Sequence, residues 1–93
     1  MKFKSNAKYG KPVESGTIFE GRIGNLKVFV HKIIHLEGWF LSCSTLQISQ
    51  MSLKSDTLMG AISEAKDVLR KAVDDLQKDV DSLCKEEIEI SRY

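Results

Sequence analysis

The clearest pattern in the sequence is an apolar stripe that recurs at three- and four-residue spacing in the last third of the chain. No proline interrupts it. Its members are Leu58, Ala61, Ile62, Ala65, Leu69, Ala72, Val73, Leu76, Val80 and Leu83. This spacing places them on one side of an α-helix. Ser55, Asp56 and Thr57 each carry an oxygen that is able to cap the first turn. The sequence therefore predicts one long amphipathic helix over about residues 57–85.

Before the helix, β-branched and aromatic residues form three segments that are separated by turn signals. The predicted strands cover about residues 17–23, 26–35 and 39–48. Gly24-Asn25 and Glu37-Gly38 are the turns between them, because glycine and asparagine tolerate the positive φ angles of tight hairpins. These elements predict an α+β fold, an antiparallel β-meander of three strands packed on one long C-terminal helix. Residues 87–92 alternate polar and apolar, and both a fourth, edge strand and frayed helix fit that pattern.

The first sixteen residues show no periodicity. They contain four lysines, two glycines and the single proline, Pro12. We interpret residues 1–16 as a flexible basic N-terminal arm and residues 17–93 as a single domain.

The predicted helix is longer than the predicted sheet. At about 1.5 Å per residue the stretch from Leu58 to Cys84 spans about 40 Å, whereas a strand of seven or eight residues spans about 25 Å. Leu76, Val80 and Leu83 should therefore extend beyond the sheet, where apolar side chains need another partner. We expect a homodimer formed there, and the alternative is that N-terminal residues fold over this end. Asp75 and Asp79 lie on the helix flank and are a candidate docking edge for a basic protein.

Composition places the chain among ordinary globular proteins, with 42% apolar and 29% charged residues in a length of 93. No segment of about 18 apolar residues is present, so we expect no membrane-spanning helix. The N-terminal residues lack the apolar stretch of a secretory signal. Cys43 and Cys84 do not form a disulfide framework, and reduced thiols in the cytoplasm are the expectation.

The charge is close to neutral overall but unevenly distributed. Residues 1–35 carry seven Lys or Arg and two Asp or Glu, whereas residues 36–93 carry seven and eleven. The basic residues of the first part are Lys2, Lys4, Lys8, Lys11, Arg22, Lys27 and Lys32. Together with Phe29 or Tyr9 as a stacking group, they form a candidate nucleic-acid surface.

No catalytic or metal-binding motif stands out in the sequence. His31 and His35 have a metal-ligand spacing only on a helix, and on a strand they lie about 13 Å apart. Ser42-Cys43-Ser44 offers hydroxyls and a thiol, but no neighbouring motif supplies a base. We therefore expect a protein that is not an enzyme and that uses no cofactor or metal.

From the third predicted strand onward, a turn glycine precedes an aromatic strand, and a capping segment leads into a helix with regularly spaced alanines. The segments are Gly38-Trp39-Phe40-Leu41-Ser42-Cys43, Leu46, Ser55-Asp56-Thr57-Leu58, Ala61-Ile62 and Glu64-Ala65-Lys66-Asp67-Val68-Leu69. In this order they resemble the core of the HicB antitoxins. The family's Pro-Asp-Leu-Pro-Gly-Cys segment is absent, since Ser44-Thr45-Leu46-Gln47-Ile48-Ser49 stands there, and Ser55 replaces a glycine before the cap.

The resemblance implies a partial ribonuclease-H-like sheet with one packed helix and a non-catalytic binding role. It does not extend to a DNA-binding domain after the helix, so control of an operator is not implied. Our leading hypothesis is a homodimeric protein-interaction module that binds an unidentified protein, as an antitoxin-like inhibitor or a small phage or prophage accessory protein. The alternative is a nucleic-acid-binding protein that uses the basic N-terminal half.

Overall fold

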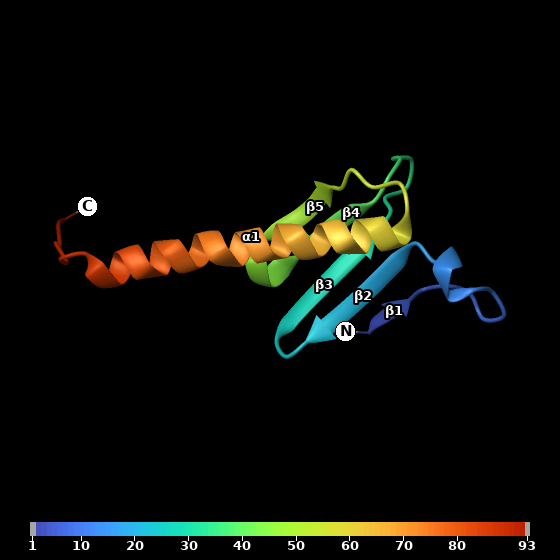
Figure 1. The fold of residues 1–93 in the computed structure, drawn as a ribbon, viewed down its shortest axis with the longest axis horizontal. Coiled ribbons are helices and arrows are strands. Elements are labelled where there is room, and N and C mark those ends of the chain that lie inside the picture. The colour runs from blue at the N-terminus through green and yellow to red at the C-terminus, as the bar shows by residue number, and fades with distance from the viewer. Residues whose placement is uncertain (1, 93) are drawn as a thin grey trace.

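The computed structural model describes residues 2–92 and shows an α+β fold, a five-stranded antiparallel meander followed by one long helix (Figure 1). The strands are β1 (Phe3–Ser5), β2 (Ile18–Ile23), β3 (Leu26–His31), β4 (Phe40–Cys43) and β5 (Ile48–Ser52), and the helix is α1 (Leu58–Lys85). Two short 3-10 helices, η1 (Val13–Ser15) and η2 (Ser44–Leu46), lie in the connections. The strands follow one another in the sheet in chain order, each antiparallel to the next.

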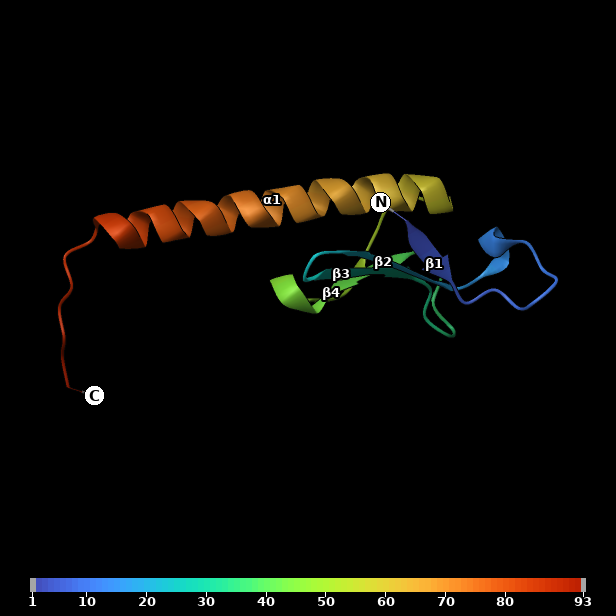
Figure 2. The same ribbon diagram turned by 90° about the horizontal axis from the view of Figure 1, so that it is seen from below.

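The helix covers one face of the sheet and leaves the opposite face open, as Figure 2 shows. Strand alternation turns Phe19, Val28 and Val30 toward α1, because side chains of alternate residues share one face. From the helix, Ala61, Ile62 and Ala65 are buried against this face. The core therefore lies between the first half of α1 and the sheet, and it includes Trp39, Leu41, Cys43 and Leu53.

The small residues of the helix allow it to lie close to the sheet. Ala61 and Ala65 are fully buried in the core, so a methyl group fills the space that a larger side chain would need. Trp39 fills the sheet end of the same core and meets Phe19 edge-to-face, with ring centroids 5.8 Å apart. Both alanines belong to the predicted apolar stripe, and their burial shows that this stripe faces the sheet.

Of the three residues predicted as possible helix caps, Thr57 is the one that caps α1. Its hydroxyl accepts a hydrogen bond from the backbone N–H of Gly60 at 3.1 Å. A Cβ at Gly60 would meet the Ser55 and Thr57 side chains, so the absence of a side chain leaves room for the capping segment. The helix begins and ends within one residue of its predicted bounds.

The observed strands differ from the predicted ones in several places. The prediction of a flexible arm over residues 1–16 is wrong for Phe3–Ser5, which form β1 and pair with Phe19–Gly21 of β2. The predicted strand over 26–35 ends at His31, because the chain turns at His35, whose φ is 68°. Residues 87–92 are described and form no strand.

The predicted third strand over residues 39–48 is two strands. After β4, the backbone forms η2 and then reverses at Gln47, whose φ of 56° is left-handed. Ile48 thereby returns beside Cys43, and β5 runs antiparallel to β4 through a register irregularity between Leu41 and Cys43. Residues 48–52 are therefore a separate strand at one edge of the sheet.

Candidate functional site

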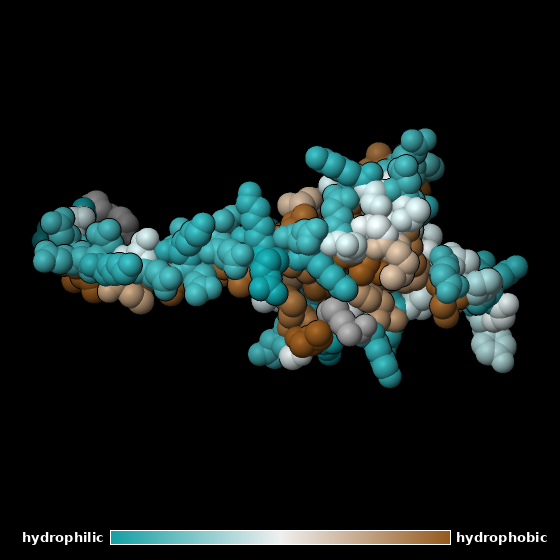
Figure 3. Space-filling view, viewed as in Figure 1, coloured by the Kyte–Doolittle hydropathy of each residue, from teal (hydrophilic) through white to brown (hydrophobic). Residues whose placement is uncertain are grey.

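The second half of α1 extends beyond the sheet, as predicted. Its 28 residues span about 42 Å, and Figures 1 and 2 show roughly half of that length standing clear of the strands. The overhang, Val73–Lys85, is exposed at every residue. Leu76, Val80 and Leu83 are 54%, 49% and 69% exposed. Figure 3 shows the hydrophobic side chains along one edge of the helix, whereas its outward surface is hydrophilic.

An apolar groove lies beside the helix on the same face of the sheet. It has a volume of about 560 Å³, and Phe3, Ile23, Leu26 and Val28 line it from the strands. The helix lines its other side with Ile62, Ala65, Lys66, Leu69, Arg70, Val73, Asp74 and Gln77. This groove is not predicted from the sequence, although Ile23 and Leu26 flank the hairpin turn and pair with each other on the core face.

A second, smaller hollow lies on the other flank of α1, against η2. Asp75, Leu76 and Asp79 line it from the helix, and Thr45, Leu46 and Gln47 line it from the η2 segment. Three of the five residues predicted for the partner interface therefore share one surface. The other two, Val80 and Leu83, continue along the exposed part of the helix.

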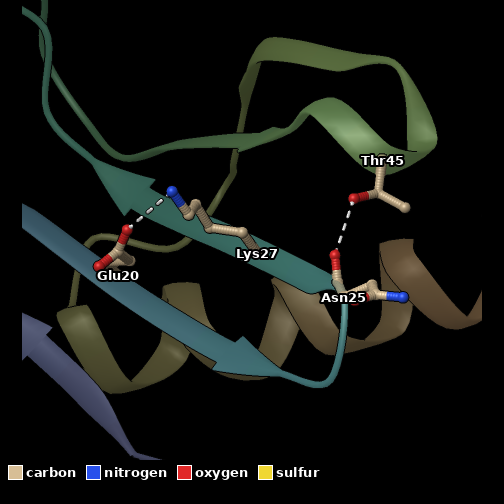
Figure 4. A network of polar contacts seen from close by, with 4 residues as sticks. All are labelled: Glu20, Asn25, Lys27 and Thr45. Carbon is tan, nitrogen blue, oxygen red and sulfur yellow. Dashed lines mark hydrogen bonds and ion pairs between the residues drawn. The ribbon is translucent and has the colours of Figure 1, made fainter.

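The face of the sheet opposite the helix carries a small basic and aromatic surface. The strand registers place Lys4, Arg22, Lys27 and Phe29 on it. The Lys27 ammonium lies 5.8 Å from the Phe29 ring centroid. It also lies 3.5 Å from Glu20, and Figure 4 shows this ion pair on the side of the sheet turned away from α1, with the contact between Thr45 and the Asn25 carbonyl nearby.

The other predicted basic residues do not join this surface. Lys8 and Lys11 lie in the connection between β1 and η1, as does the fully exposed Tyr9, and Lys2 directly precedes β1. The Lys32 ammonium lies 4.9 Å from the ring centroid of Trp39, whose side chain belongs to the core on the helix side. Of the seven basic residues, the structure therefore groups Lys4, Arg22 and Lys27.

One contact between a histidine and a serine was not foreseen. His31 Nε2 lies 2.9 Å from the Ser42 hydroxyl, which also accepts a hydrogen bond from the backbone N–H of Gln50 at 3.0 Å. The other ring nitrogen, Nδ1, lies 3.2 Å from the Lys32 carbonyl. A carbonyl only accepts, so Nδ1 donates in the contact with Lys32, and Nε2 shares a hydrogen bond with the Ser42 hydroxyl. Neither side chain lines the groove or the hollow, so we interpret the contact as a link between strands.

The remaining candidate residues lie apart. His35 is exposed in the turn after β3, so His31 and His35 do not share a strand. Cys43 is buried in the core and Cys84 is exposed on the overhang, and both are free thiols. Within residues 2–92, no group of three or more His, Cys, Asp or Glu side chains is placed to hold a metal ion.

These features define a small α+β protein whose main surfaces are an apolar helix overhang and an apolar groove. In the described part of the chain, no helix is long and apolar enough to cross a membrane. No protein-family model, no curated protein and no solved structure matches the chain.

Proposed function

We propose that this protein is a non-enzymatic protein-interaction module that associates with itself through the overhang of α1. One observation supports this proposal most directly: the apolar stripe continues past the sheet, where Leu76, Val80 and Leu83 have no strands to cover them. Full burial of such a side chain stabilises a folded or bound state by about 1.5–3 kcal/mol. Three of them on one helix edge therefore favour association.

The dimer would leave the Asp75 and Asp79 flank free for a second protein. The hollow between this flank and η2 combines two carboxylates with the apolar side chain of Leu46, which suits a basic partner with an apolar anchor. The resemblance to the HicB antitoxin core supports the same kind of role, so we propose an antitoxin-like inhibitor or a phage or prophage accessory protein. Co-purification of one small basic protein with the native chain, lost in Asp75→Lys, is the expected result.

Light scattering after size exclusion tests self-association. We expect the wild-type chain to have twice the mass of one chain, and Leu83→Asp to have the mass of one. The adjacent Ser82→Asp is the matched control, because it introduces the same charge one residue away on a different side of the helix. A wild-type chain that stays monomeric at high micromolar concentration would refute the proposal.

A second candidate function is the binding of single-stranded nucleic acid on the open face of the sheet. The observation that favours it is the grouping of Lys4, Arg22 and Lys27 around Phe29 on a face that no helix covers. Cationic side chains attract phosphates, and an aromatic ring on a sheet stacks bases of any sequence.

Fluorescence anisotropy with a labelled oligothymidine or oligouridine tests this function. We expect binding that weakens steeply with salt, and a smaller salt dependence for Arg22→Ala, since each phosphate contact contributes to the slope. Lys78→Ala on the outer surface of the helix is the control. Undetectable binding at low ionic strength would eliminate this candidate and leave the self-association proposal untouched.

A further inference from the structure

The sheet is wider than the single helix that covers it. Five strands at about 4.8 Å spacing span about 19 Å from β1 to β5, whereas a helix with its side chains is about 10 Å across. Because α1 packs its buried residues over the middle of the sheet, it leaves part of the same face exposed. That part is the groove formed by Phe3, Ile23 and Leu26. A second helix packed about 9 Å from α1 would therefore lie over β1 and β2, along the edge of this face.

The overhang matches this groove in length and in chemistry. The thirteen residues from Val73 to Lys85 span about 20 Å. The wall that α1 gives to the groove, from Ile62 to Gln77, spans about 24 Å. Both surfaces are apolar at their centres and exposed. Each chain thus carries one helical segment with an exposed apolar edge and one exposed apolar groove that is able to bind a helix.

We propose that the groove of one chain binds the overhang of a second copy, and that the exchange is reciprocal. The two α1 helices then lie side by side and antiparallel, and the two-fold axis between them runs roughly perpendicular to the sheets. Each overhang leaves its own sheet and packs its apolar edge onto the partner's sheet. This inference rests on the self-association proposed above and specifies its geometry. In a two-fold arrangement every contact occurs twice, so both overhangs are covered at once.

The charges on the groove side of the helix fit this arrangement. Lys66 and Arg70 line the groove in the first half of α1. Asp81 follows Arg70 at a spacing of eleven residues, which is three helical turns, so it lies on the same flank in the overhang. In an antiparallel pair centred near residue 74, Asp81 of one copy lies opposite Lys66 and Arg70 of the other. Asp81 therefore meets basic side chains of the other copy in both directions, whereas Asp74, which also lines the groove, lies near its counterpart at the two-fold axis.

The overhang of the same chain is unable to fill the groove. α1 runs without a break from Leu58 to Lys85 and carries the overhang away from its own sheet (Figure 1). Folding back would require breaking the helix and losing its backbone hydrogen bonds. A second copy supplies the same residues with no such loss.

Charge insertion in the groove tests the geometry separately from self-association. Ile23 lies on the groove side of β2 and is 58% exposed, whereas Ile18 lies on the open side of the same strand and is 43% exposed. Both positions tolerate a long polar side chain. We expect Ile23→Arg to raise the dissociation constant of the dimer at least tenfold and Ile18→Arg to change it less than twofold. A wild-type monomer overturns both proposals. A dimer that is equally stable in both variants overturns only the proposal that the overhang binds in the groove.

Cysteine crosslinking tests the antiparallel arrangement. Native Cys84 is exposed on the overhang, and in the proposed dimer it lies near Lys66 of the other copy. Within one chain the two positions are about 27 Å apart along the helix, well beyond the Cα separation of about 7 Å that a disulfide spans. Under mild oxidation, Lys66→Cys should form crosslinked dimers that Cys84→Ser abolishes. Asp67→Cys, on the outer side of α1, is the control, and equal crosslinking of both variants would overturn the arrangement.

Discussion

The carboxylate of Glu64 accepts a hydrogen bond from the backbone N–H of Lys54, with 2.9 Å between the nitrogen and each oxygen. It accepts a second one from the N–H of Ser55 at 3.0 Å. Glu64 lies in the second turn of α1, and the two amides belong to the segment that leaves β5. This side chain therefore fixes where the helix starts relative to the sheet, and it orients the overhang as a consequence.

We predict that Glu64→Ala destabilises the fold by about 1–2 kcal/mol, because two backbone amides lose a charged acceptor. Glu64→Gln should cost less, since it keeps one carbonyl oxygen. The measurement is the free energy of unfolding in urea. Ser63→Ala, at the neighbouring exposed position, is the control and should lie within about 0.5 kcal/mol of the wild type. Equal stabilities of Glu64→Ala and Ser63→Ala would contradict the role of this carboxylate.

Two alanines of the apolar stripe should respond differently to enlargement. Ala65 is fully buried between helix and sheet, whereas Ala72 is half-buried where the sheet ends. Ala65→Leu should therefore destabilise the fold by about 1–3 kcal/mol through overpacking. Ala72→Leu should cost less than about 0.5 kcal/mol, because its added atoms extend into open space. Thermal unfolding of both variants checks this, and a smaller loss for Ala65→Leu than for Ala72→Leu would contradict the packing described here.

The helix could be predicted from the sequence because its signals are local. The spacing from Leu58 to Leu83 and the capping hydroxyl of Thr57 depend only on residues a few positions apart. The observed ends of α1 therefore lie within one residue of the predicted ends. The β2–β3 hairpin could be predicted for the same reason. Gly24, with a φ of 56°, lies between two segments of matching pattern.

The short edge strands could not be predicted, because partners far along the chain define them. Phe3–Ser5 have no periodicity of their own and become a strand by pairing with Phe19–Gly21. Residues 48–52 look polar and become a strand because the left-handed turn at Gln47 returns them to β4. The groove and the contact between His31 and Ser42 depend on the same long-range registers. The overhang was predictable since it required only the lengths of helix and strands.

Asn6 ties the connection after β1 to the start of β2. Its side-chain oxygen accepts from the backbone N–H groups of Thr17 at 2.7 Å and Ile18 at 3.0 Å, and its amide donates to the Thr17 hydroxyl at 3.1 Å. We predict that Asn6→Ala costs about 1–2 kcal/mol in the free energy of unfolding.

Amide hydrogen exchange gives a local check on this prediction. The amides of Thr17 and Ile18 should exchange faster in Asn6→Ala than in the wild type, whereas Lys8→Ala, in the exposed part of the same connection, should leave both unchanged. Unaltered exchange at both amides in Asn6→Ala would show that Asn6 does not hold this connection.

The Ser42 hydroxyl joins three strands, since it lies on β4, contacts His31 of β3 and accepts from the backbone N–H of Gln50 in β5. Ser42→Ala removes both contacts and leaves the Gln50 amide without this acceptor, beside the register irregularity of β4 and β5. We predict a loss of about 1–2 kcal/mol in the free energy of unfolding and faster hydrogen exchange at Gln50. Ser44→Ala is the matched control, because Ser44 is exposed two residues further along. If both variants unfold at the same urea concentration and Gln50 exchanges at the wild-type rate, the hydroxyl does not stabilise this edge of the sheet.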